Sequence, residues 1–501
     1  MSCGWGDNTD RLPQGLGKFS AGSWCDVICA ATLIDMGKIM HKFAADIGIV
    51  RSFLVMAIGL ATFAGCEPAD ESAGVGATPK IPLKLTIISP HSERIRNTFA
   101  DAFSKWYDQN YQKSVSIEWI VRGTPQCVKY IDNLFEGHDA QGAMAAPDLM
   151  FGGGLEDHRG LAARDRCFEL DLGDSLDGVP ADIHGLPVRD EKNRWVATGL
   201  STFGILYNEA DCKARGIEPP TTWTDLADPR FDGWLAIANP AQSGSNRQCM
   251  MLILQQQGWE EGWKTLVKIL ANARVLESSS TRVQDQVASG VMLACFAVNF
   301  DGLRRVQENP DSLQYINPPG ATAATPDITS VLKTAADSRL AQQFVKFCLS
   351  DEGQAIWSMK AKGGDGAART LYHYPIKPGL YESHKDQLAV ADNPFVNDFG
   401  VRIDQDAAVK QSTAIIPMTG AICGENHIRL QQTWEAIQDE GMNDVALTKL
   451  CEPLIGEQEA YEALSKVQGA GDDEALAIHQ KWSDAFRAKI EEAVQIAKGG
   501  E

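Results

Sequence analysis

Residues 219–250 read PPTTWTDLADPRFDGWLAIANPAQSGSNRQCM. The spacing of apolar and turn-forming residues predicts a short helix with an Asp/Thr start, a strand over residues 234–238 and then a second helix. The turn before the second helix contains Ser243, Gly244 and Ser245. A helix N-terminus presents unsatisfied N–H groups and the positive end of the helix dipole, which attract anions. A serine at this place also caps its own helix, and both interpretations stay open.

The residues before this stretch alternate between strand and helix patterns. Residues 83–87 alternate apolar and polar side chains as a strand does, and over residues 93–106 apolar side chains recur every three to four positions as in a helix. Residues 115–119 predict a second strand, residues 127–135 a helix, and PDLMFGGG at 147–154 a third strand that ends in a glycine loop. This alternation predicts a doubly wound, mainly parallel α/β sheet.

Ligands of such sheets bind beyond the carboxyl ends of the strands, where the loops lie. The loops expected there span residues 89–93, 151–157 and 198–203. A serine-rich turn, ESSST at 277–281, precedes another predicted helix and either caps it or faces a ligand. The candidate ligand-binding residues of the three loops are Ser89, His91, Gly152, Gly153, Gly154, Ser201 and Thr202.

The composition argues against several classes of function. The formal net charge is -20, and Lys and Arg form no run, so the chain lacks the clustered cations that neutralise phosphates in a nucleic-acid complex. The sequence contains no HExxH motif and no nucleophile elbow, so we predict no catalytic residues.

The N-terminal part has the layout of a bacterial secretory signal with a lipoprotein processing site. The apolar run FLVMAIGLATFAGC covers residues 53–66, after a basic and polar flank. It is shorter than the about 20 apolar residues of a membrane span. We therefore expect a leader over residues 1–65, a lipidated Cys66 that tethers the body to a membrane, and a linker over residues 66–81.

Eight cysteines follow Cys66, and export to an oxidising compartment would permit disulfides. Cys127 with Cys167 and Cys423 with Cys451 are candidate bridges, although the sequence does not fix the pairing. There is no CxxC motif and no zinc-like spacing.

Two blocks of this sequence resemble the signature of type II solute-binding proteins from ABC importers. The first, from Thr222 to Ser245, matches the pattern W-D-L-x-D-P-x-(W/F)-x-G, then P, then S-G. The second, from Asn309 to Gln354, looks like the return crossover of that family followed by its F-x-L-S-x-E-G-Q helix. The resemblance runs from about Leu83 to Trp357. It is strongest to the branch that binds ferric iron, related oxyanions and phosphonates.

The resemblance implies two α/β lobes, joined by crossing strands, that close on a solute by a hinge motion and deliver it to a membrane permease. Lobe one would comprise residues 82–200 and 325–370, and lobe two residues 201–324. Residues 371–501 would form a helical extension that packs on lobe one. Such proteins do no covalent chemistry, so the resemblance implies neither enzyme activity nor a cofactor. The implied partners are a small-molecule solute, the ABC permease and its ATPase subunits, with the receptor a periplasmic monomer.

In the ferric-iron branch, a tyrosine pair after the strand that here reads LACFAVNFDG holds the metal, with a His from the first loop and a carboxylate from the second. His91 stands at the histidine position, but Phe300 and Asp301 occupy the tyrosine positions, and Gly153 lies near the carboxylate position. Hard Fe(III) requires anionic oxygen donors, so a bare ferric ion is not expected. Metal binding by His91 with Asp301 is the weaker alternative. Residues 372–374, Tyr-His-Tyr, form a further candidate cluster or simply pack a loop.

The resemblance instead implies a small anionic or zwitterionic solute. Asp301 would pair with a cationic group of the solute, and Asn299 belongs to the same candidate set, whereas Ser243, Ser245 and the glycine loop would receive the anionic end. Asp301 followed by Gly302 is also a common turn. The alternative functions are a ferric-iron or ferric-complex binding protein of the same family, a ligand sensor for a membrane receptor and an enzyme on the same scaffold.

Overall fold

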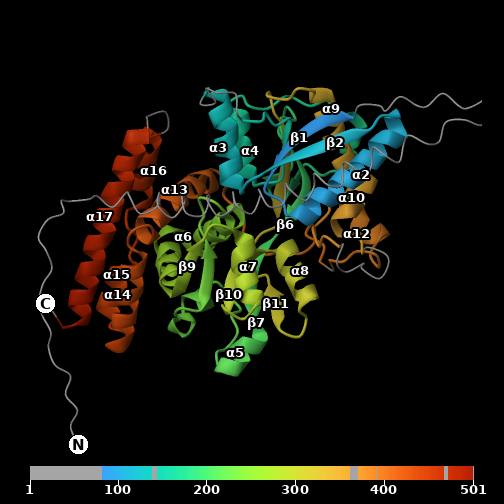
Figure 1. Cartoon of the computed structure of the whole chain (residues 1–501). Coiled ribbons are helices and arrows are strands. Elements are labelled where there is room, and N and C mark those ends of the chain that lie inside the picture. Colours follow the sequence, from blue (N-terminus) through green and yellow to red (C-terminus); the bar gives the residue numbers. More distant parts are fainter. Residues whose placement is uncertain (1–81, 138–143, 361–369, 391, 468–471, 500–501) are drawn as a thin grey trace, which may run out of the picture. The chain divides into compact units, whose positions relative to one another are not determined.

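The computed structural model describes residues 82–137, 144–360, 370–390, 392–467 and 472–499, which belong to one compact unit (Figure 1). The predicted leader, the lipidation at Cys66 and the linker lie outside the described residues. Among the helices that are described, none is long and apolar enough to cross a membrane.

The first five-stranded sheet has the strand order β2-β1-β3-β12-β6. β1 runs parallel to β2 and β3, whereas β12 runs antiparallel to β3 and β6. The sheet is therefore mixed, because the strand that returns from the second sheet enters in the opposite direction. The strands are β1 (Leu83–Ser89), β2 (Val115–Val121), β3 (Leu149–Phe151), β6 (Val196–Ser201) and β12 (Thr325–Val331).

Helices cover this sheet and bury a regular apolar face. Ile95, Phe99, Phe103 and Tyr107 of α2 are spaced four residues apart, and all four are buried in the core beneath the helix. We call this sheet with its helices lobe one. Its helices are α2 (Glu93–Tyr111), α3 (Thr124–Phe135), α4 (Leu155–Ala163), α9 (Ser338–Leu349) and α10 (Asp351–Ser358), with a short hairpin of β4 (Asp182–Ile183) and β5 (Leu186–Pro187) at one side.

The second sheet has the strand order β11-β7-β10-β8-β9, with β8 parallel to β9 and β10, and β7 antiparallel to β10 and β11. We call this sheet with its helices lobe two. Its strands are β7 (Phe203–Asn208), β8 (Leu235–Ala238), β9 (Ala273–Glu277), β10 (Ala294–Val298) and β11 (Leu313–Ile316), and its helices are α5 (Glu209–Arg215), α6 (Gly244–Asn272), α7 (Ser280–Ala288) and α8 (Asn299–Glu308).

Two connections cross between the lobes. β6 of lobe one continues through Thr202 into β7 of lobe two, and the chain returns from β11 to β12 through residues 317–324. Thr322 joins the two crossings, because its hydroxyl donates a hydrogen bond of 2.7 Å to the Phe203 carbonyl oxygen.

The C-terminal extension departs from our expectation that it packs on lobe one. Residues 371–390 do contribute buried side chains to the lobe one core, but the helices that follow bury theirs in the core of lobe two (Figure 1). Trp434 illustrates this, since it is fully buried and its Nε1 donates a hydrogen bond of 2.7 Å to Asn272 at the end of α6. The part that packs on lobe one contains α12 (Gly379–Ser383). The helices that follow are α13 (Gln405–Cys423), α14 (His427–Asp439), α15 (Asp444–Cys451), α16 (Glu457–Val467) and α17 (Asp472–Ala497).

The reason lies in α6, which is apolar on more than one side. Residues 249–254 are six consecutive buried residues, so the outer face of the helix needs a cover as well as the face that packs on the sheet. α13, α14 and α15 supply that cover, and α17 packs behind them.

The segment between these two parts of the extension forms a third crossing between the lobes, which we call the strap (residues 392–404). Thr322 accepts a hydrogen bond from the Val401 amide and donates its own amide to the Phe399 carbonyl oxygen. The strap therefore runs alongside the return crossover of the two lobes.

The eight cysteines of the described residues are all buried free thiols. The candidate bridges Cys127–Cys167 and Cys423–Cys451 are therefore wrong. Each of these side chains lies within an apolar core, where a free thiol packs as a small hydrophobic group.

Candidate functional site

A cavity of about 480 Å³ lies between the two lobes, within the usual size range of small-molecule sites. Its walls are the loops at the carboxyl ends of the strands of both sheets, together with Ile403 from the strap. Of the residues predicted from the sequence, those that line it are His91, Gly153, Gly154, Ser201, Ser243, Gly244, Ser245 and Asp301.

The other four candidates do not line the cavity. The Ser89 hydroxyl donates to the Phe151 carbonyl oxygen, and Gly152 lies against the His91 ring with a φ of 93°. The Asn299 side chain accepts a hydrogen bond from the Thr202 amide and donates one to the Tyr372 carbonyl oxygen. Ser89, Gly152, Thr202 and Asn299 therefore lie behind the cavity wall, and a direct contact of these residues with a solute stays a prediction.

Six helices begin at the cavity, each directly after a strand. α2, α3 and α4 come from lobe one, and α6, α7 and α8 come from lobe two. The N-cap residues of α2 and α3, Ser92 and Gly123, make no side-chain capping hydrogen bond. Their first-turn amides therefore stay available to a solute, and the positive ends of the helix dipoles converge on one volume.

Three of the six helices already carry their own carboxylates at this end. Glu93 lies in the first turn of α2 and lines the cavity. Glu156 and Asp157 lie in the first turn of α4, and Asp301 lies in the first turn of α8. Burial raises the pKa of Glu156 although a backbone amide opposes the shift. Burial also raises the pKa of Asp301, opposed first by the charge of Arg304. α3, α6 and α7 have no acidic residue in their first turns, so these N-termini favour an anion most clearly.

The serines of lobe two have both of the roles that the sequence allowed. The Ser243 hydroxyl accepts a hydrogen bond from the Asn246 amide, and the Ser279 hydroxyl accepts one from the Thr281 amide, so each caps its helix. Both serines also line the cavity, with Ser245 and Ser280 beside them. Capping orients these N-termini and leaves the neighbouring hydroxyl groups on the cavity wall.

Direct contacts hold the two lobes together around the cavity. Nη2 of Arg247 on α6 lies 2.7 and 2.5 Å from the two carboxylate oxygens of Asp157 on α4. Gly123 of lobe one lies so close to lobe two that an added Cβ would stand 1.7 Å from the Gln242 carbonyl oxygen. The structure therefore represents the closed arrangement of the lobes.

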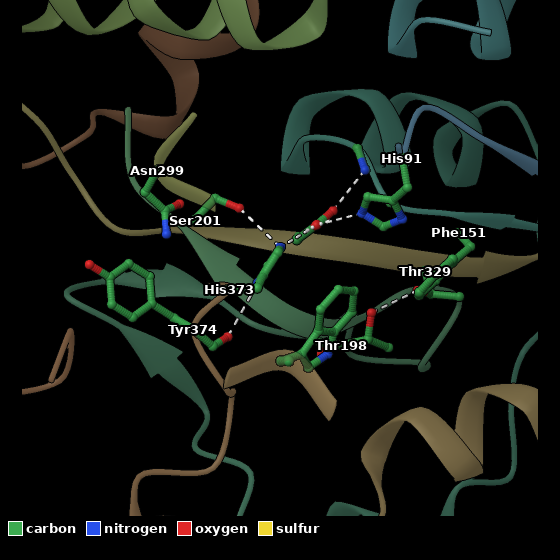
Figure 2. Close-up of polar contacts among 12 residues, drawn as sticks. His91, Phe151, Thr198, Ser201, Asn299, Thr329, His373 and Tyr374 are labelled. Carbon is green, nitrogen blue, oxygen red and sulfur yellow. Dashed lines mark hydrogen bonds and ion pairs between the residues drawn. The ribbon is translucent and has the colours of Figure 1, made fainter. Parts of the chain in front are cut away.

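His91 and Asp327 line the cavity, and with the buried His373 they form a histidine–aspartate–histidine cluster. Figure 2 shows the two imidazoles of this cluster. Nε2 of each imidazole lies 2.9 Å from Oδ2 of Asp327, and the Gly153 amide donates to Oδ1 of the same carboxylate at 2.9 Å. Burial raises the pKa of Asp327, but the charge of His91 and hydrogen bonds from both imidazoles outweigh burial and hold that pKa well below its usual range. The cluster fixes the glycine loop that leads into α4.

Aromatic rings enclose His373. Phe300 of lobe two stacks on its imidazole with a centroid distance of 4.7 Å, and Trp357 lies at 4.3 Å on lobe one. Phe300, which stands where the ferric branch has a tyrosine, therefore acts as an apolar contact between the lobes.

Asp327 was not predicted as a site residue because it has no partner within reach along the chain. The residue is 236 positions from His91 and 46 from His373. A carboxylate on a predicted crossover strand, together with the histidine named in residues 372–374, was the available signal.

His91, Asp327 and His373 are also the residues whose donor atoms come close enough to share a metal ion, within 4.8 Å of one another in the described part of the chain. Asp301, predicted as the partner of His91, is not among them. His91 Nδ1 is buried without a hydrogen-bond partner. A metal on Nε2 would place the proton on Nδ1, where it has no acceptor, so these residues fit a hydrogen-bonded cluster better than a metal site.

Two sheets with the same strand arrangement, chain crossings between them and a cavity at the strand ends are the architecture of the two-lobed periplasmic binding proteins. Residues 157–364 match the family model of bacterial extracellular solute-binding proteins. The predicted resemblance to the type II solute-binding proteins of ABC importers is thereby confirmed, and so is the α/β fold with its helical extension.

Among curated proteins, the chain is 29% identical over 284 residues to the phosphoglycerate transport regulatory protein PgtC of Salmonella typhimurium. The aligned part covers 56% of this chain and 65% of the length of PgtC.

Solved structures show the same fold at lower identity. The periplasmic binding protein AfuA from Actinobacillus pleuropneumoniae, with exogenous fructose-6-phosphate bound, aligns with a TM-score of 0.50 and 20% identity, over 66% of this chain and 98% of AfuA. Iron-bound HitA from Pseudomonas aeruginosa aligns with a TM-score of 0.50 and 18% identity, over 67% of this chain and 97% of HitA. The substrate-binding protein of an ABC transporter from Agrobacterium tumefaciens aligns with a TM-score of 0.51 and 18% identity, over 68% of this chain and 96% of that protein.

Proposed function

We propose that this protein is the extracytoplasmic receptor of an ABC importer and that its cavity captures a small organic anion that carries a phosphate group. The observation that carries the proposal is the convergence of helix N-termini from both lobes on one cavity. The N-termini of α3, α6 and α7 lack acidic residues, and serines and glycines surround them, as a phosphate requires.

The comparisons support this class of solute. AfuA was solved with fructose-6-phosphate bound, and the name of PgtC refers to phosphoglycerate. HitA is bound to iron, but its fold is shared at only 18% identity, and neither Phe300 nor Asp301 is the tyrosine expected of a ferric site. A phosphorylated organic anion therefore suits this cavity better than a ferric ion.

A thermal-shift screen of the purified protein tests the proposal. Phosphorylated compounds should raise the unfolding temperature in a concentration-dependent way, because a ligand that binds the folded state stabilises it by mass action. Neutral sugars and ferric citrate are the controls. A shift with ferric citrate and none with any phosphate compound would contradict the proposal, and steady consumption of a stabilising compound would favour an enzyme instead.

The proposed solute should bind without chemical change and pass to the permease and its ATPase subunits. We propose that the receptor is a monomer in the periplasm, held at the membrane by lipid on Cys66. Replacing Cys66 by Ser should move the protein from the membrane fraction to the soluble fraction. A protein that stays with the membrane after this substitution would refute the lipid tether.

The name of PgtC contains the word regulatory, which favours a ligand sensor for a membrane receptor as the second candidate function. Both functions use the same binding event. Deleting the gene separates them: loss of solute uptake with the permease still produced indicates a transport receptor, whereas loss of permease production itself indicates a sensor.

A further inference from the structure

We propose that Arg96 and Arg122 form a second subsite in lobe one, which binds a carboxylate or other acidic group of the solute away from its phosphate. This inference rests on the proposed function and narrows the solute to a compound with two acidic groups, such as a phosphorylated hydroxy acid.

The charges around the cavity single out these two arginines. Arg247 also lines the cavity, but Asp157 neutralises it, and nearby Arg94 pairs with Glu308 at 3.3 Å. Within the described residues neither Arg96 nor Arg122 forms an ion pair. The guanidinium of Arg122 donates to the carbonyl oxygen of its neighbour Val121, which leaves its positive charge uncompensated.

The missing counter-charge matters more for Arg96 than for Arg122, because part of the Arg96 guanidinium is already removed from water. Its Nε is buried and has no hydrogen-bond partner. Burial lowers the pKa of Arg96, and Glu93 opposes the shift. A partly desolvated cation on the wall of a cavity is stabilised by an anion that enters the cavity.

The topology brings the two arginines to the same place. β1 and β2 are adjacent parallel strands with Ser89 opposite Val121, and the Arg122 amide donates to the Ser89 carbonyl oxygen at 3.3 Å. Arg122 follows β2 directly, and Arg96 lies in the first turns of α2, which follows β1. The uncapped N-termini of α2 and α3 line the same cavity, so the two cations and these amides are both open to a solute.

The phosphate of the solute would bind at a separate subsite in lobe two. Residues 243–245 and 278–281 line the cavity at the N-termini of α6 and α7 and contain no charged side chain. Amides and hydroxyls suit a phosphate, whereas the planar fork of an arginine matches a carboxylate. A solute with both groups would bridge the lobes, and each group would stabilise the closed arrangement.

A matched series of four probes tests the inference by isothermal titration calorimetry on the purified protein. Phosphoglycerate carries phosphate and carboxylate, glycerol phosphate lacks the carboxylate, glycerate lacks the phosphate, and inorganic phosphate lacks the carbon skeleton. The variants are Arg96→Gln and Arg122→Gln. Arg429→Gln serves as the matched control, because Arg429 is 54% exposed on α14 and pairs with Glu491 at 3.7 Å.

The wild-type protein should bind phosphoglycerate at least about 10-fold more tightly than glycerol phosphate. Arg96→Gln and Arg122→Gln should each weaken phosphoglycerate binding by about 10- to 100-fold, the range expected for a lost hydrogen bond to a charged group. They should leave the affinity for glycerol phosphate within about threefold, and Arg429→Gln should change neither value. An unchanged unfolding temperature shows that each variant is folded.

Two results would overturn the inference and leave the proposed function in place. One is equal affinity of the wild-type protein for phosphoglycerate and glycerol phosphate. The other is an equal loss of affinity for both compounds in the two arginine variants. If no phosphate-bearing probe binds the wild-type protein, the proposed function itself fails.

Discussion

Replacing Gly123 by alanine should block closure of the lobes while leaving each lobe folded. Gly123 is the N-cap of α3 and has φ −65° and ψ 156°, which any L-residue adopts. The local cost of alanine at an N-cap is therefore small, about 1 kcal/mol or less. In the closed arrangement, however, the new Cβ would lie 1.7 Å from the Gln242 carbonyl oxygen of lobe two.

The distances give the size of the effect. Real Cβ atoms essentially never come within 3.0 Å of such an atom, so the lobes must part by about 1.3 Å at this contact (3.0 less 1.7 Å). The same displacement at the nearby Arg247–Asp157 pair would lengthen its 2.7 Å contact beyond hydrogen-bond reach. A hydrogen bond between charged groups contributes about 1.5–3 kcal/mol. A loss of about 2 kcal/mol from the closed state lowers the apparent solute affinity about 30-fold.

Calorimetry with the tightest-binding phosphate compound measures the affinity, and small-angle X-ray scattering measures closure. Gly379→Ala is the control, since Gly379 also begins a helix but an added Cβ would meet no atom within 4 Å. We expect Gly123→Ala to have a larger radius of gyration than the wild type with solute present, and Gly379→Ala to match the wild type. Wild-type affinity and compaction in Gly123→Ala would refute the reasoning.

Three further predictions concern stability and pH. Asp327→Asn removes the charge that pairs with two buried imidazoles and should lower the free energy of unfolding by about 3–5 kcal/mol, measured by urea titration; a change under 1 kcal/mol would contradict the role of the cluster. Trp434→Ala should cost about 3–5 kcal/mol and unfold lobe two together with the extension, so a separate early transition of the helices in calorimetry would be the contrary result. Burial raises the pKa values of Asp301 and Glu156, and an anion beside them favours their protonated forms further. Solute affinity should therefore be greatest at low pH and fall as pH rises through these raised values, and Asp301→Asn should flatten the profile measured by calorimetry; an unchanged slope would exclude Asp301 as a neighbour of the solute.

The strand and helix periods were readable in the sequence because each element has its own buried face. The motif around residues 222–245 was readable for a similar reason. Trp223 is fully buried and donates from Nε1 to the Ala321 carbonyl oxygen, and the Asp225 carboxylate accepts hydrogen bonds from the amides of Thr221 and Thr222. Such contacts join neighbouring residues or are common to proteins of this fold, so the order of residue types in the sequence indicates them.

Contacts between distant segments were not readable. The Arg247–Asp157 pair joins residues 90 positions apart, and nothing near either residue marks the other as its partner. In the last helix Trp482, Phe486 and Ile490 are buried with Ile478 beside them, but such an amphipathic pattern identifies a buried face and not the surface that covers it. The run of apolar residues at 249–254 was the sign that α6 needed a second cover.

The strap links closure of the two lobes to the outer surface of the molecule. Phe395 of the strap packs against the core of lobe one, and Val401 is buried in the core of lobe two. Gln405, at the start of α13, also bonds to Arg159 and to the Gly185 carbonyl oxygen of lobe one. Helices α13–α17 pack on lobe two, so they move together with lobe two when the angle between the lobes changes. Closure on a small solute would therefore change the outer surface of the molecule over an area large enough for another protein to recognise.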